Sequence, residues 1–410
     1  MPVYLDHAAT TPMLPEAIEA YTAALGIVGN PSSIHSQGQN AKRMLEEARE
    51  QVASSLGCDP IEVVFTSGGT ESINLALKGL YWARNEGANR PRILVPLGEH
   101  HATIDTIEWL KRYEGAVIEW LPLDSLGRVS LPALAAALEQ HDDIALVTVL
   151  WGNNEVGTIQ PIAEVVELAS RYGVPVHSDA VSVYKHLPID FRSTGLAALS
   201  VSAHKIGGPL GIGALVLART TTVVPLIHGG GQQRDVRSGT QDAPSAISFG
   251  VAARHPSVSL AHLRDRVIAG VLAAVPQAVL HGDPVNRVDN NAHFTFPGCE
   301  GDSLLFLLDV AGVSVSTGSA CRAGIPEPSH VLLAMGLDDV EARGALRITV
   351  GHSTTEADVD AFLAALPEAY ARASRAGLAD RDVTDRDVGA DRDVADRDVA
   401  DRNISAEYRA

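Results

Sequence analysis

Short runs of apolar residues alternate along this chain with longer segments in which apolar residues recur every three or four positions. The apolar runs lie at 62–67, 92–98, 144–150, 174–180, 196–203 and 211–218. The segments with helical spacing lie at 40–57, 68–85, 101–112 and 162–173. This alternation is typical of a mainly parallel sheet with helices on both faces. We therefore expect an α/β fold with a mainly parallel sheet in the first part of the chain.

The pattern changes near residue 255, at the sequence RHPSVS. Beyond this point a helical segment leads to the apolar runs NNAHFTF (290–296) and GALRITVG (344–351), which indicate a smaller α+β domain. We expect a short N-terminal segment (1–14), a large domain (15–255), a small C-terminal domain (256–375) and a tail (376–410).

The tail repeats the sequence DRDV from residues 380, 385, 391 and 396, with a DRNI variant at 401. Steps of about five residues fit neither the helical period of about 3.6 nor the strand period of about 2, so the repeated valines cannot line one helical face. We expect the tail to be disordered and to take no part in catalysis.

Charge and cysteine content exclude several classes of protein. The net charge of −18 argues against direct nucleic-acid binding. No apolar run approaches the length of a membrane span, and the start lacks the features of a signal peptide, so no membrane partner is expected. Cys58, Cys299 and Cys321 lack metal-ligand spacing and are too few for a disulfide framework. We expect a cytoplasmic protein without a metal site.

The sequence SVSAHKIGGPLGIGAL carries the strongest chemical signal. Lys205 follows an apolar run and a histidine, and a glycine-rich turn follows it. Such a lysine can form a Schiff base with an aldehyde cofactor if its surroundings lower its pKa. The alternative is a surface lysine beside a turn.

Three further motifs follow apolar runs. In TSGGTES, the amides and the Thr70 hydroxyl suit a phosphate at a helix N-terminus, although Thr70 or Ser67 could simply cap that helix. In VHSDAVS, Asp179 could keep a pyridine nitrogen protonated or could cap a helix. In GEHHATIDT, His100 could stack on a flat ring, or it could be structural.

A lysine, a phosphate-binding turn, an aspartate and a histidine on turns of one sheet together indicate pyridoxal phosphate. In these motifs the chain resembles the cysteine desulfurases, which belong to the class V aminotransferase superfamily of fold-type I enzymes. The resemblance extends from residue 3 to about residue 370. It includes the sequences VYLDHAATTP, GNPSSIHSQGQNAKRMLEEAR, NNEVGTIQPI, GGGQQRDVRSGT, STGSACRAG, PSHVLLAMG and LRITVGHSTT.

The resemblance implies a pyridoxal 5'-phosphate site in the large domain. Lys205 would be the Schiff-base lysine, Asp179 the partner of the pyridine nitrogen, and His100 the stacking residue and acid/base. The phosphate would be held by Gly69, Thr70, Ser202 and His204. Thr240 would reach the site of the other subunit, which implies a homodimer.

It also implies how the substrate is bound. Arg347 would clamp the substrate carboxylate, although without the resemblance it could be a rim salt bridge. Asn154 would lie by the cofactor's phenolic oxygen and the substrate, and Asn291 could also lie near the site. The N-terminal segment would pack near the small domain and the active site.

Cys321 lies among residues too small to bury it, in the sequence VSVSTGSACRAG. The resemblance implies that its thiolate takes sulfur from L-cysteine as a persulfide and leaves L-alanine. The sulfur would then pass to an acceptor protein, such as an iron–sulfur scaffold or a thiolation carrier. Cys58 and Cys299 have no such setting, and we expect both to be bystanders.

The chain departs from the family pattern at Ser182, where the family usually has a glutamine that donates to the phenolic oxygen. Leu210 also replaces a usually basic or polar residue. Other functions on the same scaffold stay open, namely a selenocysteine lyase, an aminotransferase or an epimerase. A binding module that has lost its chemistry is a further alternative, with Ser182 as its one hint.

Overall fold

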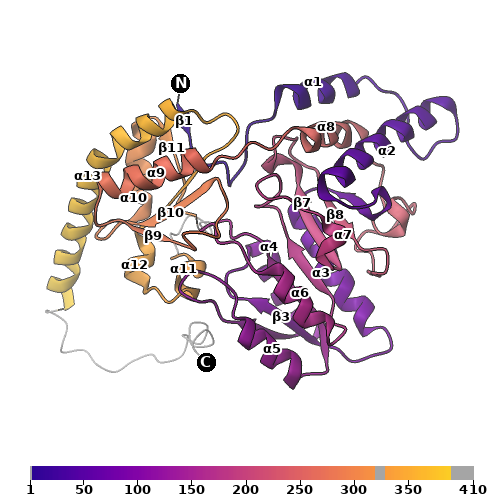
Figure 1. Ribbon diagram of the computed structural model, residues 1–410, viewed down its shortest axis with the longest axis horizontal. Coiled ribbons are helices and arrows are strands. Elements are labelled where there is room, and N and C mark those ends of the chain that lie inside the picture. Colours follow the sequence, from indigo (N-terminus) through magenta and orange to yellow (C-terminus); the bar gives the residue numbers. More distant parts are fainter. Residues whose placement is uncertain (1, 319–327, 389–410) are drawn as a thin grey trace.

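A computed structural model of the chain describes residues 2–318 and 328–388. In it, the six apolar runs of the first 255 residues and one further strand form a single seven-stranded sheet (Figure 1). The strands are β2 (Val63–Thr66), β3 (Arg92–Pro96), β4 (Val117–Leu121), β5 (Ile144–Leu150), β6 (Val176–Asp179), β7 (Ala198–Ser202) and β8 (Gly213–Leu217). Their order is β2-β8-β7-β6-β5-β3-β4. Only β8 pairs antiparallel with its neighbours; the other pairs are parallel. The prediction of an α/β fold with a mainly parallel sheet is confirmed.

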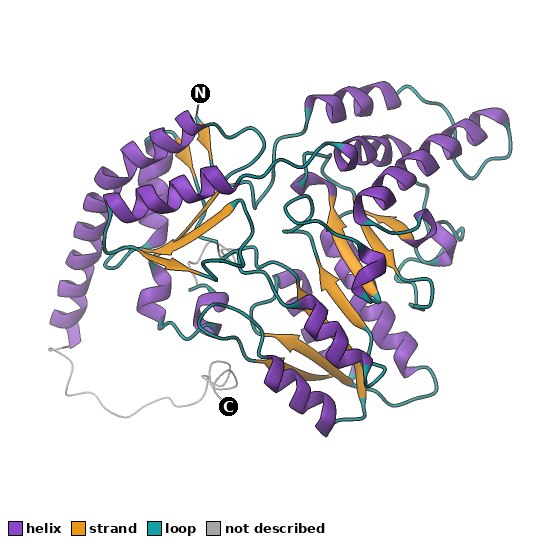
Figure 2. Ribbon diagram, in the orientation of Figure 1, coloured by secondary structure: helices purple, strands orange, loops and turns teal. Residues whose placement is uncertain are grey.

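Helices cover both faces of this sheet (Figure 2). One face packs against α2 (Ser36–Leu56), α5 (Leu131–Gln140), α6 (Ile162–Ser170) and α8 (Ala243–Arg254), and the other against α3 (Gly69–Asn85) and α4 (His101–Glu114). Successive strand residues point to opposite faces, so Phe65 joins the first core and Val64 the second. We call this part, residues 15–255, the large lobe. Its shorter helical segments are α1 (Pro15–Ala24), η1 (Pro60–Glu62), α7 (Phe191–Thr194), η2 (Ala203–Lys205) and η3 (Gln233–Asp235).

The sequence pattern did not reveal β4 and α5. β4 is an edge strand in which Val117 is exposed, and Glu119 interrupts its apolar residues. An edge strand needs no continuous apolar run, because one of its sides stays open to solvent.

The chain beyond residue 255 forms a small lobe around an antiparallel sheet of β12 (Ala345–Thr349), β10 (Asn291–Thr295) and β9 (Val279–His281). Its core is built from Phe294, Phe296 and Phe362, together with leucines of the packed helices. The helices are α9 (Ala261–Ala274), α10 (Gly301–Val310), α11 (His330–Ala334), α12 (Asp339–Arg343) and α13 (Glu356–Val388). None of the helices in the described part of the chain is both long and apolar enough to cross a membrane.

The first residues of the chain link the two lobes. β1 (Val3–Tyr4) pairs in parallel with β11 (Val313–Ser314) of the small lobe. A few residues later, the amides of Thr11 and Leu14 donate to the carbonyl oxygens of His204 and Gly207 in the large lobe. The N-terminal segment therefore crosses from one lobe to the other beside the end of β7.

The helix α13 corrects one expectation about the tail. We expected disorder from residue 376, but the backbone stays helical through Val388. Extending a helix that is already formed requires much less free energy than starting one, so a weakly helical sequence can continue it. Residues 389–410 lie outside the described residues.

Candidate active site

The carboxyl ends of β2, β3, β5, β6 and β7 bring the predicted polar residues to one edge of the large sheet. Parallel strands place their C-terminal ends at the same edge, which is where such sheets bind ligands. The turns after these strands carry Gly69 and Thr70, His100, Asn154, Asp179 and Ser182, and Ser202 to Lys205.

Lys205 ends the short turn η2 that follows β7. Its Nζ atom donates to the carbonyl oxygens of Ala8 and Ala9, the latter at 2.9 Å. Burial and the positive charge of Arg347 lower its pKa to about 8, while Asp6 and Asp179 act in the opposite direction. A lysine with a pKa this close to neutrality can act as a nucleophile, as the sequence predicted.

Asp179 ends β6 and is 2% exposed. Its Oδ1 atom accepts a hydrogen bond from the amide of Val181 at 2.9 Å. Burial nevertheless raises its pKa to about 6. Among the described residues, Asp179 has no cationic partner at hydrogen-bond distance. A protonated ring nitrogen would supply one.

The turn before α3 fits a phosphate group. Its N-cap residue, Gly68, offers no side-chain cap, so the first amides of a 17-residue helix remain available. A side chain at Gly69 would collide with Val181, because its Cβ atom would lie 2.8 Å from Val181 Cγ2. That Cβ position is also 3.7 Å from the Cβ atom of Ser202, so the turn and the end of β7 are in contact.

Ser202 supplies the strongest test of whether the site fits the cofactor. Its side chain is 1% exposed, and its hydroxyl has no hydrogen-bond partner among the described residues. A buried hydroxyl without a partner is unfavourable unless a ligand completes it. An acceptor oxygen of a phosphate next to the α3 turn would do so. Thr70 is exposed in the same turn.

His100 is the N-cap of α4, and its Nδ1 atom accepts from the amide of Ala102 at 3.0 Å. The residue as a whole is exposed, but packing of protein around its imidazole lowers the pKa to about 4, with a further contribution from the charge of Lys205. The imidazole is therefore uncharged at neutral pH and free to lie against a flat ring. His100 thus also caps the N-terminus of α4.

Arg347 lies in β12 of the small lobe and is 5% exposed. Its Nη2 atom donates to Asp6 Oδ1 at 2.8 Å and its Nη1 atom to the carbonyl oxygen of Asn154 at 3.0 Å. Its buried Nε atom has no partner among the described residues. A guanidinium carries five N–H donors, so donors remain for a substrate carboxylate.

A cavity between the lobes brings four predicted residues together. Its lining includes Lys205, Asn154, Ser182 and Asn291, together with His7 of the N-terminal segment. The Nδ2 atom of Asn291 donates to the carbonyl oxygen of Glu155 at 3.0 Å, while its buried Oδ1 atom has no partner within the described chain. Asn291 therefore lies at the site, as the sequence suggested.

The other predicted residues that the structure describes, among them Asp179, Ser202 and Arg347, do not line this cavity, and neither do His204 and Thr240. The Nδ1 atom of His204 bonds with the Thr10 hydroxyl at 3.2 Å, and burial lowers the pKa of this histidine to about 4. Thr240 is exposed between η3 and α8. Its predicted role concerns a second subunit, so it stays a prediction.

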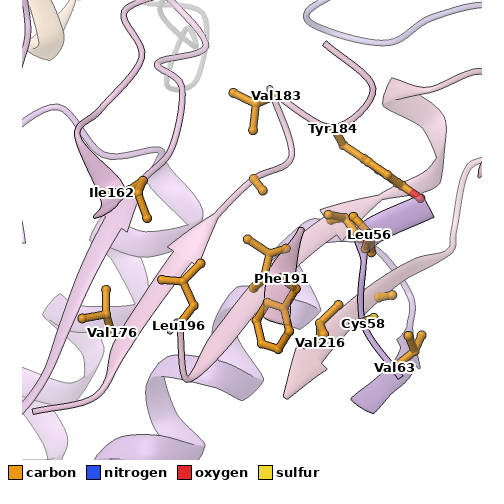
Figure 3. Close-up of a cluster of buried hydrophobic side chains, with 14 of the residues drawn as sticks. Leu56, Cys58, Val63, Ile162, Val176, Val183, Tyr184, Phe191, Leu196 and Val216 are labelled. Carbon is orange, nitrogen blue, oxygen red and sulfur yellow. The ribbon is translucent and has the colours of Figure 1, made fainter. Parts of the chain in front are cut away.

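The predicted sulfur acceptor, Cys321, lies outside the described residues. The other two cysteines are buried, and Cys58 packs among Leu56, Val63 and Val216 (Figure 3). Burial raises the pKa of Cys58 to about 12 and that of Cys299 to about 11. Both thiols stay protonated at neutral pH and are poor nucleophiles.

Sequence reasoning missed Asp6 and Glu99. Asp6 lies in the sequence VYLDHAATTP, but no sequence pattern indicates its ion pair with Arg347, which is 341 positions away. Glu99 precedes His100 and is 1% exposed; its Oε1 atom accepts from the amide of Leu150 at 2.6 Å. Burial raises its pKa well above the ordinary value, and the charge of Asp179 adds to this. Glu99 therefore links the turn after β3 to the end of β5.

Comparison with known proteins agrees with this geometry. The family model of class V aminotransferases matches residues 3–362. An IscS-like cysteine desulfurase from Mycobacterium tuberculosis is 55% identical over 386 residues, which cover 92% of this chain and 98% of that protein. The solved structure of a NifS-like protein has a TM-score of 0.83 at 34% identity and covers 90% of this chain and 99% of that one. The structure of SspA in complex with cysteine has a TM-score of 0.76 at 33% identity, with coverage of 85% and 98%.

The fold is thus that of the class V aminotransferases, a family of pyridoxal phosphate enzymes. The chain belongs to this family and, within it, to the cysteine desulfurases.

Proposed function

We propose that this chain binds pyridoxal phosphate through Lys205 and converts L-cysteine to L-alanine, with transfer of sulfur to Cys321. The observation that carries the proposal is the approach of two groups from different lobes: Lys205 lines a cavity with Asn154, and Arg347 donates to the carbonyl oxygen of Asn154. The lysine amine has a pKa of about 8, and the buried guanidinium of Arg347 keeps unused donors beside it. One group suits an aldehyde and the other suits the carboxylate of an amino acid.

The residues at the strand ends fit the cofactor. Asp179 would accept a hydrogen bond from the ring nitrogen, and the neutral ring of His100 would lie against the ring face. The phosphate would be held by Ser202, His204, Thr70 and the amide of Gly69. When bound, the cofactor draws electrons from the substrate's α-carbon, which weakens the bonds to its neighbours.

The chain's own residues would perform the remaining steps. Lys205 would exchange a proton with the substrate's α-carbon, and Arg347 and Asn154 would orient its carboxylate. The Cys321 thiolate would attack the substrate sulfur, so that the carbon–sulfur bond breaks and a sulfur–sulfur bond forms. The substrate carbon keeps the electron pair of the broken bond and takes up a proton, so the products are alanine and a Cys321 persulfide.

The substrate assignment draws on the relatives. The Mycobacterium tuberculosis relative is named as an IscS-like cysteine desulfurase, and the structure of SspA was solved in complex with cysteine. The acceptor of the sulfur would be a separate protein, such as an iron–sulfur scaffold or a thiolation carrier. The homodimer, the role of Thr240 in it and the cytoplasmic location are further parts of the proposal that rest on the resemblance.

The test compares the three cysteines. Cys321→Ser should keep the absorbance of the bound cofactor and its response to L-cysteine, but should release neither sulfide nor alanine at a useful rate. Cys58→Ser and Cys299→Ser are the matched controls, and both should stay active because their buried thiols are not nucleophiles. After one turnover of the wild type without reductant, mass spectrometry should find one added sulfur on the Cys321 peptide.

Two outcomes would contradict the proposal. The added sulfur could appear on Cys58 or Cys299, or Cys321→Ser could desulfurate cysteine normally. A lyase, an aminotransferase or an epimerase on the same scaffold requires no acceptor thiol, so normal activity of Cys321→Ser would favour one of these.

A further inference from the structure

Residues 6–9 of the N-terminal segment contact reactive groups of both lobes. The Asp6 carboxylate pairs with Arg347 of the small lobe at 2.8 Å. Two and three residues later, the carbonyl oxygens of Ala8 and Ala9 accept hydrogen bonds from the amine of Lys205 in the large lobe. One short piece of chain therefore holds both the carboxylate clamp and the nucleophilic lysine.

Side chains on either side fix the shape of this segment. The Tyr4 hydroxyl lies 2.9 Å from the carbonyl oxygens of Asp6 and Thr10 and hydrogen-bonds to both. The amide of Ala9 donates to the carbonyl oxygen of Asp6 at 3.0 Å, which closes a turn. The carbonyl groups of Ala8 and Ala9 are thereby held toward Lys205.

Of the groups around Lys205, Arg347, Asp6 and Asp179 affect the pKa of its amine through their charge. The charged or titratable groups that surround it come from several elements. They are Asp6 and His7 of the N-terminal segment, His100 before α4, Asp179 of β6, His186 after β6, His204 of η2 and Arg347 of β12. Burial lowers the pKa of three of these histidines, His7, His100 and His204, to about 4, so they are uncharged at neutral pH. Arg347 is the cation that lowers the lysine's pKa, and Asp6 is its direct ion-pair partner.

We propose that residues 6–9 are a positioning element for Lys205: the carbonyl oxygens of Ala8 and Ala9 hold its amine when it is not bonded to the cofactor, and the Asp6 carboxylate shields this amine from the charge of Arg347. The inference rests on the proposed function, because it gives Lys205 a bonded and a free state. A lysine that must both add to an aldehyde and carry a proton works best when its pKa lies near the working pH. The negative charge of Asp6 offsets the positive charge of Arg347, which would otherwise lower the pKa of the amine further and favour its uncharged form.

The experiment uses the full-length chain freed of bound cofactor by hydroxylamine and dialysis. Labelling of Lys205 by trinitrobenzenesulfonate is followed by peptide mass spectrometry at several pH values. In Asp6→Asn, the unshielded Arg347 should stabilise the neutral amine, so labelling near pH 7 should rise roughly fivefold while labelling near pH 10 stays the same. Asp6→Glu keeps the carboxylate and should resemble the wild type.

Four further variants make the assignment specific. Arg347→Gln should lower labelling near pH 7, and Asp6→Asn with Arg347→Gln should return it toward the wild-type rate. Tyr4→Phe should loosen the segment and raise labelling at every pH without moving the midpoint. Asp360→Asn breaks an exposed pair with Arg266 and should change nothing.

The shielding role is overturned if Asp6→Asn leaves the midpoint unmoved or raises labelling equally at all pH values, because a purely structural role predicts the latter. The hold by Ala8 and Ala9 is overturned if Tyr4→Phe leaves the labelling rate unchanged. None of these readouts needs cofactor or sulfur release. Their failure is therefore distinct from failure of the proposed activity, which the Cys321→Ser experiment tests.

Discussion

The two sides of the candidate site are built in different ways. On the large-lobe side, Asp179, Ser202 and Lys205 stand at or just after the ends of neighbouring strands of one sheet. On the small-lobe side, Arg347 projects from the middle of an antiparallel strand. Its two hydrogen-bond partners, Asp6 and the carbonyl oxygen of Asn154, belong to the N-terminal segment and to the large lobe.

This difference separates two tasks. The large-lobe groups are placed by the backbone of a single sheet, which suits a cofactor that stays bound through many turnovers. The orientation of Arg347 depends on contacts between parts of the chain that are far apart in sequence, which suits a substrate that enters and leaves. Substitutions on the two sides should therefore have different signatures, in cofactor binding on one side and in substrate affinity on the other.

The largest effect is expected at Lys205. Lys205→Ala removes the nucleophile and proton carrier, so turnover should fall by roughly 10⁴-fold or more. Lys185→Met is a matched control, because Lys185 lines a neighbouring cavity with Lys205 but, among the described residues, bonds only to the Ala253 carbonyl oxygen. Steady-state alanine production measures both. Borohydride trapping of the cofactor on a lysine other than Lys205 would contradict the assignment.

Arg347→Gln tests the other side of the candidate site. Losing a charged hydrogen-bonding partner for the substrate carboxylate should lower kcat/KM for L-cysteine by roughly 10- to 100-fold. Cofactor absorbance should stay close to that of the wild type. Arg266→Gln, in an exposed pair of the same lobe, should have no effect. If Arg347→Gln loses cofactor as strongly as it loses substrate affinity, the two sides are not separate.

Asp179 provides a pH-dependent test of the large-lobe side. Burial raises its pKa from the ordinary 3.8 to about 6, so the folded chain holds this proton more tightly than the unfolded chain. The resulting stabilisation is complete below about pH 4 and is lost as the pH rises through about 6.

Asparagine cannot ionise and avoids that loss. Without cofactor, Asp179→Asn should match the wild type at the acidic end and exceed it at pH 8 by on the order of 3 kcal/mol in the free energy of unfolding. Urea unfolding at several pH values measures the difference, and Asp360→Asn, at a carboxylate in an exposed ion pair, serves as the control. A pH-independent difference would show that the carboxyl is not held protonated by burial.

The smallest effect is expected at Ser182, which lines the cavity. Ser182→Gln adds an amide donor there, so the pH midpoint of the bound cofactor's absorbance should shift while turnover changes by only about two- to threefold. Ser182→Ala should leave the spectrum nearly unchanged, because a serine is too short to reach the phenolic oxygen directly. An unmoved midpoint in Ser182→Gln would mean that another residue already supplies the hydrogen bond.

The same comparison explains what the sequence could predict. Lys205, Asp179 and the Gly69–Thr70 turn each follow an apolar run directly, so the strand-end rule was enough to bring them together. Arg347 had no such local signal and was assigned only through the family resemblance. Asp6 escaped notice because its partner is distant in sequence, and Glu99 because its burial depends on how β3 and β5 pack.

The pairing of β1 with β11 also bears on how the protein is made. In addition, Asp6 and Arg347 are separated by 341 positions, so Asp6 leaves the ribosome long before its partner exists. At bacterial or eukaryotic synthesis rates of about 5–20 residues per second, this interval lasts roughly 17–70 s. The large lobe can fold during that time, but β1 and Asp6 still lack their partners. The substrate side of the candidate site is therefore completed last, when nearly the whole chain has been synthesised.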